Sequence, residues 1–197
     1  MAITTSYSLK QVQRRLLKSK VMGCLREEDR KKASIEITHR LCSHPVWQDA
    51  RVVALYSSLP SEPDTSDIFR LAKASKKKVL FPKVAGKQLL FFEVEKKEDL
   101  EKNFMGIMEP KSSCIEVSSQ DMDLILVPGV GFDRQGQRLG RGLGLYDRYL
   151  STLPSKVCRI GLYFSFQEIH KIYTEPHDQR LDLIITEKEL IRVVLRS

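Results

Sequence analysis

The sequence predicts an α/β fold: a single domain over residues 1–197, built as a three-layer open sheet that is largely parallel and carries helices on both faces. Two patterns favour this class. Short apolar runs alternate along the chain with segments of helical periodicity, as in parallel sheets covered by helices. Several of these runs are apolar at consecutive positions, which is typical of strands buried on both faces. A chain of 197 residues is long enough to bury a core of this kind.

The first predicted helix covers residues 8–25, with Ser8 as its cap. Its apolar stripe, spaced for one helical face, is Leu9, Val12 and Leu16. Lys10 and Arg14 lie four residues apart, so both cations share another face of the same helix. A solvated face is the ordinary interpretation of such a pair, and an anion-binding face is the alternative.

Three further helices are expected. One covers residues 26–44, with acidic residues in its first turn and an end at His44-Pro45. Its apolar stripe is Ala33, Ile37 and Leu41. Another helix covers residues 64–77, with Asp64 or Thr65 as the cap, and a last one begins at about Tyr146.

The strands are expected where the chain is continuously apolar. The predicted strands cover residues 51–58, 78–84, 88–95, 123–132, 158–165, 181–187 and 190–195. The strand at 123–132 ends at Pro128-Gly129, residues 103–110 form a loop, and residues 133–138 form a turn. Alternation of these strands with the helices indicates a Rossmann-like architecture.

Composition excludes several classes. No apolar run approaches the roughly 20 residues that span a bilayer, and the N-terminal residues lack the apolar region of a secretory signal. The cysteines show no C-x-x-C spacing, so we expect reduced thiols in a cytoplasmic protein and neither a zinc site nor a redox pair. These cysteines are Cys24, Cys42, Cys114 and Cys158. The net charge of +8 favours anionic partners, although the usual nucleic-acid-binding motifs are absent.

The stretch GRGLGLYDRYL, residues 140–150, carries the clearest functional signal. Gly140, Gly142 and Gly144 lie between a predicted strand and a predicted helix, where glycine permits positive φ and leaves main-chain N–H groups open to a ligand. Arg138 and Arg141 add fixed positive charge suited to phosphate. The spacing matches neither a Walker loop nor a dinucleotide fingerprint. From the residues alone this is a phosphate-binding loop or a purely structural one.

Two aspartates are candidate magnesium ligands. Asp147 directly follows the glycine stretch, and magnesium usually takes one or two carboxylates together with phosphate oxygens and water. An acid in the first turn of a helix is also a common dipole partner. Asp182, at the start of a predicted strand, is a candidate second carboxylate or a plain edge acid.

The segment DLILVPGVGFDRQGQRLGRGLGLYDRYL resembles the signature of the 5-formyltetrahydrofolate cyclo-ligase family, also called methenyltetrahydrofolate synthetases. The family pattern R-L-G-R-G-x-G-Y-Y-D is matched by residues 138–147 except at Leu145, where the family usually has the first of two tyrosines. Three further segments match in order: KQVQR, YSSLPSEPDT and PHDQRLDLIITE. The resemblance covers nearly the whole chain.

This resemblance implies an enzyme, a carbon–nitrogen ligase that forms a ring. It would close 5-formyltetrahydrofolate, including polyglutamylated forms, to 5,10-methenyltetrahydrofolate, with ATP and Mg²⁺ required and ADP and phosphate released. It further implies a cytoplasmic monomer whose partners are these small molecules, without nucleic acid or membrane. The alternatives are a non-catalytic basic nucleotide- or RNA-binding module and a sugar-phosphate or acyl-CoA enzyme on a similar fold.

The resemblance also implies residue roles. The ATP-binding residues would be Lys10, Arg14, Arg138, Leu139, Gly140, Arg141, Gly142, Leu143, Gly144, Leu145 and Tyr146. The folate-binding residues would be Tyr56, Glu62, Met105, Arg141, Gly142, Leu143, Gly144 and Leu145. Arg141 and Tyr146 would be catalytic, and Asp147 and Asp182 would hold magnesium. Leucine at 145 lacks the hydroxyl and the ring of the usual tyrosine.

Overall fold

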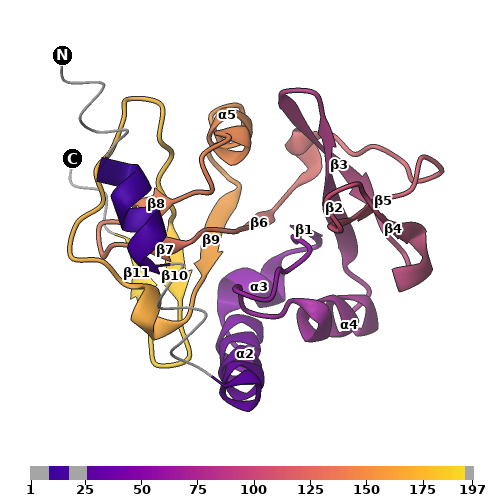
Figure 1. Ribbon diagram of the computed structural model, residues 1–197. Helices are drawn as coiled ribbons and strands as arrows, with labels where there is room; N and C mark the ends of the chain where they lie inside the picture. The colour runs from indigo at the N-terminus through magenta and orange to yellow at the C-terminus, as the bar shows by residue number, and fades with distance from the viewer. Residues whose placement is uncertain (1–8, 18–25, 194–197) are drawn as a thin grey trace.

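The computed structural model describes residues 9–17 and 26–193 and contains a central seven-stranded sheet (Figure 1). The strand order is β11-β10-β9-β6-β1-β2-β3. The five strands from β10 to β2 run parallel, and the edge strands β3 and β11 are antiparallel to their neighbours. The bounds are β1 Val52–Ala54, β2 Lys78–Ala85, β3 Gln88–Glu93, β6 Leu124–Val127, β9 Cys158–Leu162, β10 Leu183–Ile185 and β11 Leu190–Arg192. The predicted α/β class with a largely parallel sheet is confirmed.

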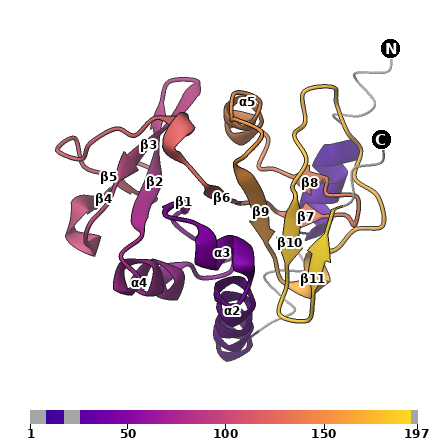
Figure 2. The ribbon, with the colours of Figure 1, turned by 180° about the vertical axis from the view of Figure 1, so that it is seen from behind.

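Both faces of the sheet are covered. Successive residues of a strand point to opposite faces, so Val53 and Leu55 enter one core cluster and Ala54 the other. The first cluster is closed by helices α2 (Glu27–Cys42), α3 (Pro45–Asp49) and α4 (Ser66–Ala74), which lie together on one side of the sheet (Figures 1 and 2). The second cluster is closed by the short helix α5 (Leu145–Leu150) and the loops around it.

The helix predictions hold for α2, whose stripe Ala33, Ile37 and Leu41 is buried and whose first turn is acidic. At α4, Thr65 occupies the N-cap position, but it is the Asp64 carboxylate that accepts the Ser66 N–H at 2.9 Å. Helix α3 was not predicted. Pro45 ends one helix and begins the next, because proline fits the first position of a helix, where no intrahelical N–H bond is lost.

The N-terminal helix, described over residues 9–17, is oriented differently from the prediction. Val12 and Leu16 of the expected buried stripe are 55% and 60% exposed, whereas Lys10 and Leu17 are buried. The helix packs through the face that carries Lys10, Arg14 and Leu17, where polar contacts of the two cations are combined with burial of Leu17 against Val130, Leu139 and Ile172. The rest of the predicted helix and its cap Ser8 lie outside the described residues.

Two segments predicted as irregular belong to short hairpins, one of them as the hairpin's turn. Residues 103–110, expected as a loop, include β5 (Met108–Pro110), which pairs with β4 (Leu100–Lys102). The turn at 133–138 joins β7 (Gly131–Phe132) to β8 (Arg138–Leu139). In that turn the buried Asp133 carboxylate accepts the N–H groups of Gln135 and Gln137, each at 3.0 Å. Single 3₁₀ turns occur at Lys97–Asp99, Ser119–Asp121 and Ser165–Gln167.

Among the described residues, no helix has the length and apolar character needed to cross a membrane. The cysteines within that part of the chain, Cys42, Cys114 and Cys158, are all free thiols, and Cys24 lies outside it. Burial raises the pKa of Cys42 to about 11 and that of Cys158 to about 12, so both are poor nucleophiles near neutral pH.

Candidate functional site

A cavity of about 630 Å³ opens where the chain leaves the carboxyl ends of β1 and β6. From β1 the chain continues toward β2 on one side of the sheet, whereas β6 is followed by β9 on the other. Ligands bind at such switch points in open α/β sheets, because the loops diverge there and leave a crevice. Tyr56 follows β1, Pro128 follows β6, and both line the cavity.

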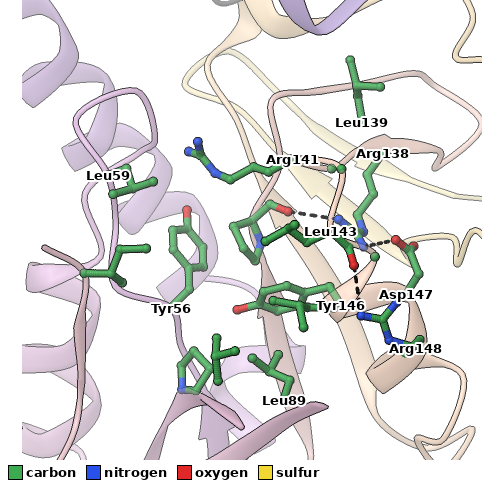
Figure 3. Close-up of a pocket in the computed structure, with 18 of the residues that line it drawn as sticks. Tyr56, Leu59, Leu89, Arg138, Leu139, Arg141, Leu143, Tyr146, Asp147 and Arg148 are labelled. Atoms are coloured by element: carbon green, nitrogen blue, oxygen red, sulfur yellow. Dashed lines mark hydrogen bonds and ion pairs between the residues drawn. The ribbon is translucent and has the colours of Figure 1, made fainter. Parts of the chain in front are cut away.

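Two walls face each other across this cavity (Figure 3). One wall comes from the segment after β1 and from the hairpins β2–β3 and β4–β5. Its lining residues are Tyr56, Ser57, Leu59, Glu62, Pro82, Val84, Leu89, Met105, Ile107, Met108 and Glu109. The other wall comes from the N-terminal helix, the glycine loop with α5, and the segment before β10. Its lining residues are Lys10, Arg14, Pro128, Arg138, Leu139, Gly140, Arg141, Gly142, Leu143, Gly144, Leu145, Tyr146, Asp147, Arg148, Glu175, His177 and Asp178.

The glycine loop lies directly against the cavity and needs its glycines for backbone reasons. Gly142 has φ of 107° and Gly144 has φ of 63°, a region that side chains disfavour. At Gly140 an added Cβ would lie 2.9 Å from an Nη atom of Arg138, so glycine makes room for that guanidinium. The loop therefore brings main-chain groups and arginines together at one wall of the cavity.

Arg138 is part of the structural floor of the site. Its side chain is 4% exposed, and its Nη2 lies 2.9 Å from a carboxylate oxygen of Asp147. Its guanidinium also lies 5.7 Å from the ring centre of Tyr146 (Figure 3). The Arg138 Nε and the Tyr146 hydroxyl are buried and have no hydrogen-bond partner among residues 9–17 and 26–193. Burial, with the nearby Glu62 carboxylate, raises the pKa of Tyr146, so its hydroxyl keeps its proton and remains a donor.

Arg141 reaches across the cavity from the glycine loop toward the wall that carries Tyr56 and Leu59 (Figure 3). Its Nη2 lies 2.6 Å from Oε1 of Glu62, and its Nε lies 3.3 Å from the same oxygen. The Glu62 side chain is 3% exposed, whereas that of Arg141 is 38% exposed. The other Glu62 oxygen accepts the Leu59 N–H at 3.0 Å.

The N-terminal helix adds two cations to the same wall. Arg14 donates from Nε to the carbonyl oxygen of Gly140 at 2.7 Å, which ties the helix to the glycine loop. Lys10 is 4% exposed and pairs with Glu175 at 2.8 Å and with Asp178. A buried lysine needs such partners because an unpaired charge is costly away from water.

The 5-formyltetrahydrofolate cyclo-ligase family model matches residues 6–187, almost the whole chain. The chain belongs to this family. The 5-formyltetrahydrofolate cyclo-ligase of Escherichia coli (strain K12) is 31% identical over 172 residues, which cover 84% of this chain and 94% of that relative. The Mus musculus 5-formyltetrahydrofolate cyclo-ligase is 28% identical over 95% of this chain and 98% of its own length.

Solved structures agree with this membership. The NMR structure of Aquifex aeolicus 5,10-methenyltetrahydrofolate synthetase matches with a TM-score of 0.85 at 34% identity, covering 96% of this chain and 95% of that chain. The Mycoplasma pneumoniae 5,10-methenyltetrahydrofolate synthetase matches with a TM-score of 0.75 at 26% identity, covering 90% of this chain and 98% of that chain.

The structure brings nearly all predicted site residues of this family member together at one cavity. The exception is Asp182, which does not line it. The Asp182 side chain accepts the Arg159 N–H at 2.8 Å at the start of the neighbouring strand, as an acid at a strand end commonly does. The expected pairing of Asp147 with Asp182 around one ion at the cavity therefore has no geometric support, and Asp147 alone of the two remains there.

Sequence reasoning missed the acidic residues beside Lys10. Ligand atoms of Glu175, His177 and Asp178 lie within 4.8 Å of one another, and all three residues line the cavity. His177 is exposed, and its loop forms part of the cavity wall. The segment PHDQRLD contains Asp178, but nothing local in it indicated that Asp178 would pair with Lys10, 168 residues away in sequence.

Proposed function

We propose that this chain catalyses the ATP-dependent closure of 5-formyltetrahydrofolate to 5,10-methenyltetrahydrofolate, with release of ADP and phosphate. Family membership supports the reaction, and one structural observation carries its assignment to this cavity. The arginine- and glycine-rich loop, suited to phosphates, faces a wall with a buried carboxylate, Glu62, across a space of about 630 Å³. Cavities of this size and lining hold small-molecule ligands.

The reaction explains why an anion-binding wall must face a folate-binding wall. The formamide oxygen of the substrate attacks the γ-phosphorus of ATP, and the bond from that phosphorus to ADP breaks. The resulting imidate-like phosphate has a good leaving group on the formyl carbon. The second folate nitrogen then attacks that carbon and loses its proton, the ring closes, and the C–O bond breaks as phosphate departs. Catalysis of such a transfer is mainly positioning and charge stabilisation, so cations must surround the phosphoryl group.

We assign the loop wall to ATP. Main-chain N–H groups of the loop, from Gly140 to Leu145, would receive the phosphates, with Lys10 and Arg14 supplying charge from the helix. Arg138, Leu139 and Tyr146 form the floor beneath them. The Tyr146 hydroxyl is protonated and has no hydrogen-bond partner in the described part of the chain, so it is a donor that a ligand oxygen could accept from.

We assign the facing wall to the folate. Tyr56 is buried beside Glu62, and a carboxylate accepts a pair of hydrogen bonds from the aminopyrimidinone edge of a pteridine. Met105, on the β4–β5 hairpin, adds an apolar contact that is 54% exposed without ligand. Arg141, Gly142, Leu143, Gly144 and Leu145 line the cavity between the two walls and would contact both ligands. Arg141 would stabilise charge on the transferring group.

Magnesium fits the donors on the loop wall. The Asp147 carboxylate lines the cavity, and hard carboxylate oxygens with phosphate and water are the donors that the ion prefers. Its oxygens also accept from Arg138 at 2.9 Å and from the Gln179 N–H at 3.2 Å, and each carboxylate oxygen has a second lone pair. Bound there, the ion would neutralise phosphate charge.

We retain a single domain, a monomer, a cytoplasmic location, polyglutamylated substrates and the absence of nucleic-acid partners as predictions.

The experiment mixes the protein with MgATP and 5-formyltetrahydrofolate and follows methenyl absorbance. We expect product that depends on ATP; product without ATP, or none with it, contradicts the proposal.

Arg14→Ala tests the ATP wall. A charge-assisted contact is worth roughly 1.5–3 kcal/mol, so the ATP KM should rise roughly 10- to 150-fold with little change in the folate KM. Arg15→Ala, on the exposed side of the same helix, is the matched control and should leave both unchanged.

A further inference from the structure

The ion pair between Glu62 and Arg141 joins the two walls of the cavity. Glu62 belongs to the segment after β1, and Arg141 belongs to the glycine loop 79 residues later. Both the Nε and an Nη of Arg141 donate to one and the same Glu62 oxygen, Oε1, at 3.3 and 2.6 Å. The pair therefore lies across the space in which we place the junction of the folate and the nucleotide.

The pair leaves Glu62 unable to receive a second planar donor group. A carboxylate oxygen has two lone pairs, and both on Oε1 face Arg141 donors. Oε2 already accepts the Leu59 N–H at 3.0 Å, so one site is left on it. Bidentate recognition needs one free site on each oxygen. A ligand with two parallel N–H donors can therefore bind Glu62 in this way only after Arg141 has moved.

The surroundings of Arg141 leave its side chain room to change position, whereas those of Glu62 hold its side chain in place. Glu62 is buried and held by its own backbone turn, in which its N–H donates to Leu59 O at 2.8 Å. Arg141 lies between Gly140 and Gly142, its side chain is 38% exposed, and its weaker second contact is to the Ser61 hydroxyl at 3.4 Å. While paired, its charge is neutralised and it is a poor ligand for phosphate.

We propose that this pair is an exchange latch: a folate that takes Glu62 releases Arg141 toward the phosphoryl group. Nucleotide and folate then bind with positive coupling, because each ligand favours the separated state of the pair. The inference rests on the proposed function and adds a positioning role for Glu62 that acts through Arg141. By reciprocity, the folate must tighten nucleotide binding by the same factor as the nucleotide tightens folate binding.

The test measures the Kd of a non-hydrolysable ATP analogue with Mg²⁺ by calorimetry, in the absence of folate. Glu62→Gln should tighten this binding about fivefold, since the competing partner of Arg141 is weakened. The Arg141→Ala variant should bind the ATP analogue more weakly than wild type does. Adding Glu62→Gln to that variant should leave the Kd of the analogue unchanged. Glu109→Gln, which removes a charge from the same wall without touching the pair, is the matched control and should change the Kd less than about twofold.

A gain from Glu62→Gln that persists in the Arg141→Ala background would show general electrostatics and overturn the latch, as would no gain in the single variant. If Glu62→Gln does not fold, Glu62→Asp shortens the reach to Arg141 and should give the same sign of change. In wild type, 5-formyltetrahydrofolate should tighten analogue binding about fivefold, and Arg141→Ala should remove this coupling. Failure of cyclisation would contradict the proposed function alone, because the variant cycle needs no folate.

Discussion

Arg138, in β8, and Arg141, in the glycine loop that follows it, lie three residues apart, line the same cavity and have the same side chain, yet they occupy opposite environments. Arg138 is 4% exposed, paired with Asp147 on its own wall and packed against Tyr146. Arg141 is 38% exposed and paired with Glu62 on the facing wall. The difference arises from the backbone, because Gly140 makes room for the Arg138 guanidinium while the chain turns at Gly142 toward the cavity.

The difference in environment indicates a structural role for Arg138 and a ligand-binding role for Arg141. A buried ion pair within one wall fixes geometry, since breaking it leaves a charge with neither partner nor water. The Arg141–Glu62 pair is exposed only on its arginine side, at the cavity, so breaking it costs less, since water or a ligand in the cavity can replace the arginine. Substitution of Arg138 should therefore lower stability most, whereas substitution of Arg141 should mainly lower turnover.

The largest effect is expected for Arg138→Ala. The Asp147 carboxylate, whose side chain is 13% exposed, would lose its ion pair, and the Tyr146 ring would lose its neighbour. Removing one partner of a buried pair costs about 3 kcal/mol, which for a chain of this size lowers Tm by about 10 °C. Activity should fall below detection. A variant with wild-type Tm by calorimetry would show that Arg138 is no more structural than Arg141.

Asp147→Asn breaks the same pair from its other side. The amide still accepts the Gln179 N–H, which the carboxylate accepts at 3.2 Å, so the stability loss should be smaller, about 2 kcal/mol. Turnover should drop at least about 100-fold, because the charge proposed to hold magnesium near the phosphates is gone. Measuring kcat across a magnesium titration tests this. Wild-type kcat with unchanged magnesium dependence would limit Asp147 to pairing with Arg138.

Arg141→Ala should show the reverse balance. The unfolding free energy should change by about 1 kcal/mol or less, since the vacated space opens to the cavity and water can reach Glu62. The kcat/KM should fall about 10- to 100-fold through loss of one charge-assisted contact to the phosphoryl group. Chemical denaturation and steady-state kinetics on one preparation of the variant measure the two losses side by side. Equal losses of stability for Arg138→Ala and Arg141→Ala would remove the distinction between them.

The elements that sequence predicted well are those set by local pattern. The stripe Ala33, Ile37 and Leu41 and the apolar run before Pro128 are periodic and continuous, and both are buried as expected. From its residues alone the glycine loop was a phosphate-binding loop or a structural one, and it lies against the cavity, where the first of these roles is possible. The roles of Tyr56 and Glu62 came from the family resemblance, since neither residue has a local signature.

What sequence could not supply depends on contacts between distant segments. The spacing of the apolar residues predicted the wrong buried face for the first helix, because the face that packs against the protein holds Lys10 and Arg14 against polar groups. Nor does the spacing of Arg138 and Arg141 say which one is buried. Asp182 was a reasonable ligand by residue type, and its N–H partner on Arg159 appears only once strands β9 and β10 are paired.

The smallest effect is expected for Leu145→Tyr, which restores the residue usual in the family. Leu145 begins α5, is partly exposed and lines the cavity next to the loop that carries Arg141. A tyrosine there adds a ring and a hydroxyl on the side we assign to both ligands, while the buried Arg138–Asp147 pair beneath remains. We expect the folate KM to fall about two- to threefold with Tm unchanged, because one partly exposed contact adds little binding energy. Ile35→Tyr, on α2 at a position that is 58% exposed and does not line the cavity, is the matched control and should change neither constant. An effect on the ATP KM alone would place residue 145 on the nucleotide side.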